Sequence, residues 1–359
     1  MKQGKSIVEL AQEIERRAEA QRDFLVPAQE VQMITEAKTV NDEIVRVPRI
    51  AFGDNAFDIT QHTHRQLGTY TGIPAKYYDK ALNSDPGLLM MNVNHWLRQA
   101  GGEKRMIRTL DNNARAWLSD RYRRLDNIEI ADALMPKILE SKDIVLASAD
   151  VTDSKLYIKA VFPSVRAEVK VGDVVEAGVI IQNSEIGMGA LSGSLFINRL
   201  KCTNGMVVND LGMRRNHVGS RLDVEGDGMY KLYSDKTIKL DNEAVISKLM
   251  DIVDAASTKE NFERAVELMR ESAKSEEMKD PEEGIVELAK IIGLNEGEAK
   301  QARRNLQEGR DYTRWGALNA VTALANDHES YDRATEIEEL GGKVLNLSRS
   351  QWRTVVEAA

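Results

Sequence analysis

The chain has 359 residues, a formal net charge of −8, 42% apolar residues and 30% charged residues. This composition supports a sizeable buried core and excludes a disordered chain. No run approaches the roughly 20 apolar residues of a membrane-spanning helix, and the charged N-terminal segment lacks the apolar region of a signal peptide. The single cysteine, Cys202, excludes an intramolecular disulfide. We therefore expect a cytoplasmic protein of two or three structural units.

Basic and acidic side chains are unevenly distributed along the chain. Residues 1–97 carry a net charge of −2, residues 98–240 carry +3 and residues 241–359 carry −9. We expect these ranges to be a mostly helical N-terminal region, a central basic sheet and an acidic helical region. Only the central range has the sign of charge that attracts a polyanion, and the last range would repel one.

The first range is predicted to be mainly helical. Apolar residues recur at helical spacing over residues 6–24, 60–71, 75–82 and 88–96. Ser6 and Glu9 form a Ser-x-x-Glu capping box at the first of these helices. The second and third helices, joined at Gly72, make a helix–turn–helix candidate. Two β-rich runs, residues 31–35 and 44–52, predict a hairpin with a turn at Asn41-Asp42.

In the central range the hydrophobic pattern changes to that of strands. The β-rich runs cover residues 105–110, 114–118, 143–149, 156–162, 174–183 and 195–200. The first two are expected to pair across a turn at residues 111–113, and a helix is predicted over residues 127–140. Glycines at 187, 189 and 193 permit bulges or a close approach of the backbone.

The acidic range is predicted to be helical throughout. The helical runs cover residues 242–256, 258–274, 284–292, 295–307, 312–326 and 331–340. Gly341-Gly342 is expected to end the last helix, because glycine commonly follows a helix C-terminus. The predicted fold class is α+β, with a helical N-terminal part, a central mixed or antiparallel sheet and a helical C-terminal part.

Eight basic residues lie between residues 98 and 124 against three acidic ones, and aromatic residues are interleaved with them. Guanidinium groups bind phosphate through paired hydrogen bonds and aromatic rings stack on exposed bases, so the mixture predicts contacts with single-stranded nucleic acid. The predicted contact residues are Arg105, Arg108, Arg115, Trp117, Arg121, Tyr122, Arg123 and Arg124. The alternative is an exposed sheet face whose arginines pair with nearby carboxylates such as Asp120 or Asp126.

A second basic window covers residues 199–221. Its predicted nucleic-acid contacts are Arg199, Lys201, Arg214 and Arg215. The glycine-rich stretch before it would let a phosphate approach backbone N–H groups. It matches neither the P-loop nor the dinucleotide-binding fingerprint, and sheet curvature is the alternative role of its glycines.

No arrangement of residues predicts catalysis, a metal site or a cofactor. Cys202 is better explained as a buried structural thiol than as a nucleophile. His62 and His64 lack a third ligand and are interpreted as surface residues. The acidic run over residues 223–227 lacks the spacing of a calcium-binding loop. We therefore expect neither cofactor nor metal and favour a protein without catalytic activity; an enzyme that acts on nucleotides or nucleic acid is the alternative.

Five segments, taken in order, resemble one known family. They cover residues 72–74, 93–97, 116–126, 200–206 and 315–322. Together they are similar to the phage- or plasmid-like proteins of the domain of unknown function 932 family, over about residues 60–330. The resemblance implies no catalytic residue. It implies a protein of mobile genomes in a bacterial host, serving replication, recombination or defence evasion.

Charge and resemblance together predict a nucleic-acid-binding protein that favours single-stranded DNA and acts by annealing in replication or recombination. Annealing proteins often form rings, so the amphipathic helices of the last range are expected to join copies of the chain in a homo-oligomer. The alternative is an interaction protein that binds a host factor through its acidic last range. Nucleic-acid binding requires that basic side chains of the central range converge on one surface.

Overall fold

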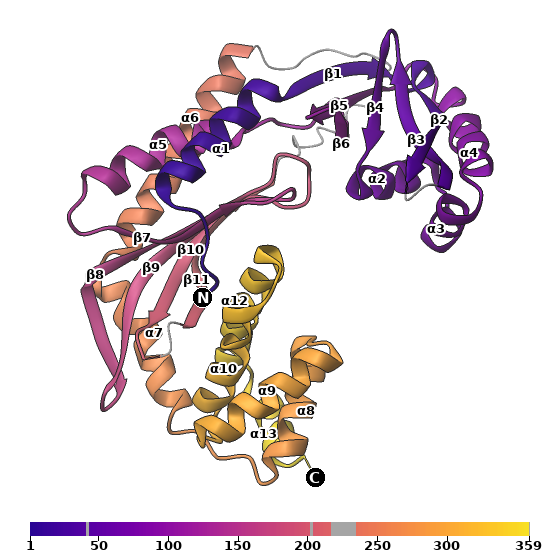
Figure 1. The fold of residues 1–359 in the computed structure, drawn as a ribbon. Helices are drawn as coiled ribbons and strands as arrows, with labels where there is room; N and C mark the ends of the chain where they lie inside the picture. Colours follow the sequence, from indigo (N-terminus) through magenta and orange to yellow (C-terminus); the bar gives the residue numbers. More distant parts are fainter. Residues whose placement is uncertain (41–42, 202–203, 217–234, 359) are drawn as a thin grey trace, which may run out of the picture.

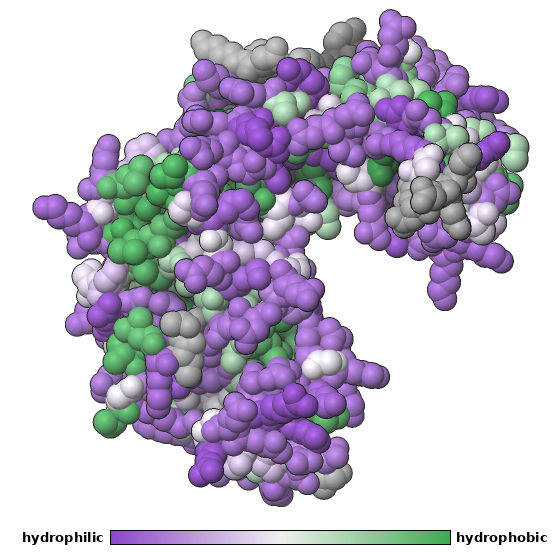
Figure 2. Space-filling model, in the orientation of Figure 1, coloured by the Kyte–Doolittle hydropathy of each residue, from purple (hydrophilic) through white to green (hydrophobic). Residues whose placement is uncertain are grey.

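The computed structural model describes residues 1–40, 43–201, 204–216 and 235–358. Figure 1 shows a curved body, with a sheet near one end, a second sheet in the middle and a helical bundle at the other end. The face seen in Figure 2 is largely hydrophilic and is hollowed between the two ends. The predicted α+β fold class is confirmed. Within the described ranges, no helix combines the length and apolar character that crossing a bilayer requires.

The first sheet has six strands, and the two at its centre run parallel. The strands are β1 (Arg22–Pro27), β2 (Gln32–Val40), β3 (Glu43–Phe52), β4 (Asn55–Ile59), β5 (Lys104–Leu110) and β6 (Asn113–Ser119). Their order is β1-β5-β6-β4-β3-β2, and the β4–β6 pair is parallel. Between β5 and β6, Asp111 and Asn112 have positive φ angles of 47° and 63°, as a type I′ hairpin turn requires. The predicted β5–β6 and β2–β3 hairpins are both confirmed; the turn at Asn41-Asp42 lies outside the described residues.

Because β5 and β6 complete this sheet, it extends to Ser119, beyond the division expected after residue 97. Its helices are α2 (Gln61–Thr71), α3 (Ala75–Ser84) and α4 (Pro86–Arg98), close to the three predicted ones. Leu67 of α2, Val93 of α4 and Ile107 of β5 are fully buried in one core. Strands β1 and β4 were not predicted, because they are short and only partly buried.

The second sheet is an antiparallel meander. Its strands are β7 (Val145–Val151), β8 (Leu156–Lys170), β9 (Asp173–Asn183), β10 (Leu191–Arg199) and β11 (Asn204–Arg215). They lie in the order β11-β10-β9-β8-β7, so strands consecutive in sequence are neighbours in the sheet. This antiparallel sheet is the one that the sequence pattern predicts for the central range.

Helices cover both faces of the second sheet. The helices of one side are α1 (Ile7–Ala20), α5 (Asn127–Glu140) and α6 (Asp235–Ala256), seen together in Figure 1. The predicted capping box of α1 is present. A Cβ on Gly193 of β10 would lie 2.8 Å from Leu249 of α6. Phe196 points to the other face, because side chains alternate along a strand.

The C-terminal part is helical, as predicted. Its helices are α7 (Lys259–Ser272), α8 (Pro281–Ile292), α9 (Glu296–Gly309), α10 (Arg314–Thr322), α11 (Leu324–Asp327), α12 (Tyr331–Leu345) and α13 (Arg349–Val356). The predicted end of a helix at Gly341-Gly342 is wrong, because α12 continues through both glycines. A Cβ on Gly342 would lie 2.0 Å from the backbone oxygen of Val207 in β11. Glycine is needed here for close packing of helix on sheet and does not act as a cap.

Candidate nucleic-acid interface

Arg108, on β5, is the most deeply buried of the predicted phosphate contacts, with no exposed side-chain area (0%). Its Nε donates to Asp23 Oδ1 at 2.9 Å and its Nη2 to Asp126 Oδ1 at 2.5 Å. Its Nη1 donates to the backbone oxygen of Glu185 at 2.9 Å. Burial lowers the pKa of Arg108, but the charges of Asp126 and Asp23 outweigh burial and raise the pKa above its usual value. Arg108 therefore stays charged inside the protein.

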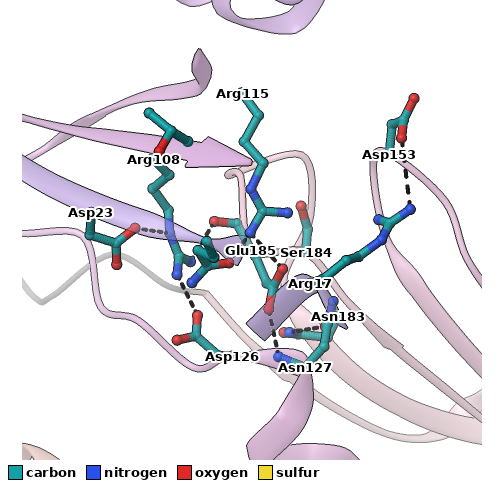
Figure 3. A network of polar contacts seen from close by, with 12 residues as sticks. Arg17, Asp23, Arg108, Arg115, Asp126, Asn127, Asp153, Asn183, Ser184 and Glu185 are labelled. Carbon is teal, nitrogen blue, oxygen red and sulfur yellow. Dashed lines mark hydrogen bonds and ion pairs between the residues drawn. The ribbon is translucent and has the colours of Figure 1, made fainter. Parts of the chain in front are cut away.

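Arg115, on β6, is also buried, with a side chain that is 8% exposed. Its Nη2 donates to Glu185 Oε2 at 2.8 Å and also to the side-chain oxygen of Gln21. The second carboxylate oxygen of Glu185 accepts the backbone N–H of Asn127, the first residue of α5, at 2.7 Å. Figure 3 shows these side chains converging on Glu185 from separate elements. Glu185 thus connects the first sheet to the helix that follows it.

Glu185 belongs to residues 184–188, between β9 and β10, which we call the junction segment. Tyr122 Oη donates to the backbone oxygen of Ser184 at 3.0 Å. The backbone oxygen of Ile186 is 2.9 Å from His62 Nε2 and 3.0 Å from Gln66 Nε2, both on α2. The junction segment therefore fastens the second sheet to the first.

The two histidines of α2 are part of the interior, so their interpretation as surface residues is wrong. His62 is half-buried on the junction segment, and burial lowers the pKa of its imidazole. His64 is 8% exposed, and its Nδ1 lies 2.9 Å from Tyr78 Oη of α3. Burial lowers the pKa of His64 to about 4. Both rings are therefore neutral at pH 7.

The predicted base-stacking residues are also interior. Trp117 is 2% exposed and Tyr122 is 8% exposed. Arg105 covers neighbouring rings, with its guanidinium 4.5 Å from the Tyr70 ring centroid, and pairs with Glu103 at 3.0 Å. We correct the predicted set accordingly: the buried side chains are not available to nucleic acid. They are Arg108, Arg115, Trp117 and Tyr122.

The predicted contacts of the second basic window lie in two groups, one at each end of strand β10. Arg199 binds both oxygens of Asp173, at 2.6 and 2.8 Å, and Lys201 is exposed just beyond it. Arg214 and Arg215 pair with the opposite end of β10. The two ends are eight residues apart, about 26 Å at 3.3 Å per residue. Arg199 and Lys201 therefore lie on a different part of the surface.

The remaining predicted arginines converge at the start of α6. Arg123, in the segment after β6, pairs with Asp241 Oδ2 of α6. Arg215, at the end of β11, pairs with the same oxygen at 2.5 Å. The side chain of Asn242 donates to the backbone oxygen of Arg124 at 3.1 Å, which holds the segment after β6 against α6. Three elements far apart in sequence thus meet around one carboxylate.

The neighbouring arginines extend this positive surface. Arg124 lies 3.3 Å from Asp23, which also pairs with Arg108, and its side chain is 57% exposed. Arg121, two residues before Arg123, is exposed and forms no ion pair within the described residues. We call the group the surface arginine cluster. Its members are Arg121, Arg123, Arg124 and Arg215; the predicted contact Arg214 is not among them, because it neighbours Arg215 on β11 and its side chain points to the opposite face of the sheet.

A family model described as "Domain of unknown function (DUF932)" matches residues 116–352. The chain belongs to the DUF932 family. Comparisons with the curated proteins and with the solved structures give no match.

The DUF932 match begins in β6 and ends in α13, so it includes the second sheet and the whole surface arginine cluster. Most of the first sheet precedes it. Of the five segments that carry the resemblance, three lie within the match and two, residues 72–74 and 93–97, lie before it.

Within the part of the chain that the structure describes, no group of three or more His, Cys, Asp or Glu side chains is arranged to hold a metal ion. Cys202 and the acidic residues 223–227 lie outside the described residues.

Proposed function

We propose that the protein binds nucleic acid, preferably single-stranded DNA, through the surface arginine cluster. The observation that carries the proposal is the convergence of Arg123 and Arg215 on Asp241. Gathering like charges on one surface is unfavourable for the protein alone, and a bound polyanion relieves the repulsion. Arg121 adds positive charge that no described carboxylate balances.

The chemistry of the cluster suits the nucleic-acid backbone. Guanidinium groups form paired, charge-assisted hydrogen bonds with phosphate oxygens. Because Trp117 and Tyr122 are buried, the proposed interface contains no predicted stacking ring. Contacts to phosphate carry no direct sequence information, so the proposed binding is independent of base sequence.

In this proposal the protein acts without catalysis, as an annealing protein in the replication or recombination of a phage or plasmid, in the cytoplasm of the bacterial host. Copies of the chain joined in a homo-oligomer would present their arginine clusters side by side along one strand. That arrangement holds a backbone extended while its bases remain open to a complementary strand.

Fluorescence anisotropy with a labelled single strand of about 30 nucleotides tests the proposal. Each phosphate contact on a single strand contributes about −0.7 to the slope of log affinity against log salt, so four contacts predict a loss of about 50-fold between 50 and 200 mM salt. A duplex of the same length and an RNA strand measure the strand preference. Binding that does not change with salt, or no binding at low salt, contradicts the proposal.

A further inference from the structure

A cavity of about 550 Å³ lies beside the junction between the sheets, between α1, α2, β6 and the junction segment. Volumes of a few hundred Å³ are typical of sites for small molecules. The residues of its wall that matter for the argument are Arg17, Thr60, His62, Arg115, Ser154 and Met188. They come from both sheets and from α1, so the cavity exists only when the junction is formed.

The N-terminus of α2 opens into this cavity. The helix has 11 residues, and the Thr60 side chain caps it by accepting the N–H of Thr63 at 3.3 Å. The first N–H groups of a helix, here those of Gln61 and His62, have no partner within it. Together with the helix dipole, they favour a negatively charged group at this position.

Arg115 provides a second, independent indication of an anion. Its Nη2 is used by Glu185 and Gln21, but its Nε is buried without a hydrogen-bond partner. Figure 3 shows its other terminal nitrogen pointing to the side where Arg17 and Asp153 lie, with no bond drawn to it. A buried N–H without an acceptor is costly. Because Arg115 lines the cavity, a ligand oxygen on that side would accept a hydrogen bond from this other terminal nitrogen.

The charged residues of the cavity wall also favour a negatively charged ligand. Arg17 and Arg65 also line the cavity. Of its two acidic residues, Asp111 has both oxygens 2.9 Å from the same nitrogen of Arg16, and the side chain of Asp153 is fully exposed to solvent. Arg17 pairs with Glu13 at 2.7 Å and lies 3.9 Å from Asp153, and Arg65 pairs with Asp79 at 2.9 Å. Glu13 and Asp79 do not line the cavity, so its wall has one more guanidinium group than carboxylate groups.

We propose that this cavity binds the phosphomonoester group of a nucleotide, between Arg115, Arg17 and the N-terminus of α2. The apolar side chains of Leu110, Ile186 and Met188 line the rest of the cavity and suit a sugar and base. Two sources have this chemistry: a free nucleoside monophosphate and the 5′-phosphate end of a strand. The second source rests on the proposed function; the first does not.

Titration calorimetry on the full chain tests the inference with three probes: adenosine 5′-monophosphate, inorganic phosphate and adenosine. We expect the two phosphates to bind and adenosine not to bind. Two single strands that differ only in a 5′-phosphate then separate the sources, since occupation by a strand end makes the phosphorylated strand bind more tightly. No binding of either phosphate and equal affinity for the two strands overturns the inference.

Two substitutions change the cavity without touching the Arg115–Glu185 pair. Arg65→Ala removes a cation whose side chain is 49% exposed, and Ser154→Glu adds a negative charge to the wall. Each is expected to weaken phosphate binding about tenfold or more, the effect of one charged hydrogen bond. Arg353→Ala is the matched control, because Arg353 forms a similar exposed pair with Glu357 at 2.9 Å.

The outcomes separate this inference from the proposed function. Unchanged phosphate binding in both cavity variants, or an equal loss in the control, overturns the cavity as the site. Binding of the monophosphate without any binding of strands supports the cavity and contradicts the proposed function. Salt-dependent binding of strands that is equally tight with and without a 5′-phosphate, together with no binding of adenosine 5′-monophosphate, supports the proposed function and contradicts the cavity as a phosphate site.

Discussion

The junction arginines, Arg108 and Arg115, and the surface arginine cluster differ in their surroundings, although most of the cluster lies within ten residues of Arg115 in the sequence. At the junction, the buried guanidinium of Arg108 pairs with Asp23 and Asp126, and that of Arg115 pairs with the buried Glu185. In the cluster, Arg123 and Arg215 share one half-exposed carboxylate. The difference teaches that the number of carboxylates around an arginine decides its role. An arginine with enough carboxylate partners stabilises the fold, and one with too few remains available to a ligand.

The largest expected effect is that of Arg108→Ala. The substitution leaves Asp23 and Asp126 without their buried counterion, which should lower the free energy of unfolding by about 3–5 kcal/mol. Urea unfolding followed by circular dichroism measures it. Arg124→Ala is the matched control, because Arg124 pairs with the same Asp23 from the exposed side and should cost less than about 1 kcal/mol. Equal costs would contradict the distinction between the two groups.

Substitutions in the surface arginine cluster test the other half of the comparison, that exposed arginines serve binding more than stability. The triple variant Arg121→Ala, Arg123→Ala, Arg124→Ala should unfold nearly as the wild type does but bind a single strand about 100-fold more weakly, at roughly 1 kcal/mol for each phosphate contact. The salt slope should become shallower by about 2. Anisotropy at several salt concentrations measures both quantities.

The control for this variant removes three basic residues from α9, in the acidic C-terminal part. They are Lys300, Arg303 and Arg304, each replaced by alanine. These residues lie on exposed or half-exposed positions. A loss of affinity in the control as large as that in the cluster variant would place the interface on the C-terminal bundle instead.

Much of the fold could be predicted from local signals. The helix over residues 127–140 has the predicted bounds, because apolar spacing and a capping box at Asp126 act within the same turn. The end of α1 was predicted too late, at residue 24, because residues 22–27 form β1 by pairing with β5, about 80 residues away. The prediction that Gly341-Gly342 ends a helix was wrong for a similar reason. The glycines are needed because β11, far away in sequence, packs closely against this helix.

The candidate site was less accessible to sequence reasoning. The pattern identified a basic surplus but not which arginines are buried, because their partners Asp23 and Glu185 lie far away in sequence. One signal was available: Glu185 directly follows a long apolar strand and precedes a glycine-rich stretch. A carboxylate in such a position needs a buried cation, and the nearby arginines are the available ones.

His64 extends the comparison to a buried basic side chain that forms no ion pair with a carboxylate. Its pKa of about 4 in the folded protein lies below the usual value of about 6.5, so the unfolded chain takes up the proton first as pH falls. The stability contribution of the neutral ring is complete above pH 6.5 and is lost between pH 6.5 and 4. Lowering the pH from 7.5 to 5 should therefore cost about 2 kcal/mol.

Urea unfolding of the wild type and of His64→Asn at these two pH values isolates the contribution. The carboxylates and His62 titrate in both proteins, so the difference between them belongs to His64. The variant should lose about 2 kcal/mol less than the wild type over this range. An identical loss in both proteins would show that folding does not lower the pKa of this ring.

The smallest expected effect, and the finest test of the comparison, comes from Asp241→Asn. The amide keeps the shape of the side chain but removes the charge that Arg123 and Arg215 share. Stability should fall by less than about 1 kcal/mol, because the pairs are partly exposed. Affinity for a single strand should rise about threefold, because the cluster gains one positive charge near the phosphates. A purely structural pair would lose stability without any gain in binding.

Asp254→Asn controls for the change in net charge on the same helix. Asp254 pairs with Lys137 at 2.5 Å and lies 13 residues beyond Asp241, about 20 Å along α6 at 1.5 Å per residue. That separation exceeds the Debye length of about 10 Å at 0.1 M salt. The control should therefore leave strand affinity unchanged, whereas an equal gain in both variants would mean that total charge attracts the strand and that the cluster has no special part in binding.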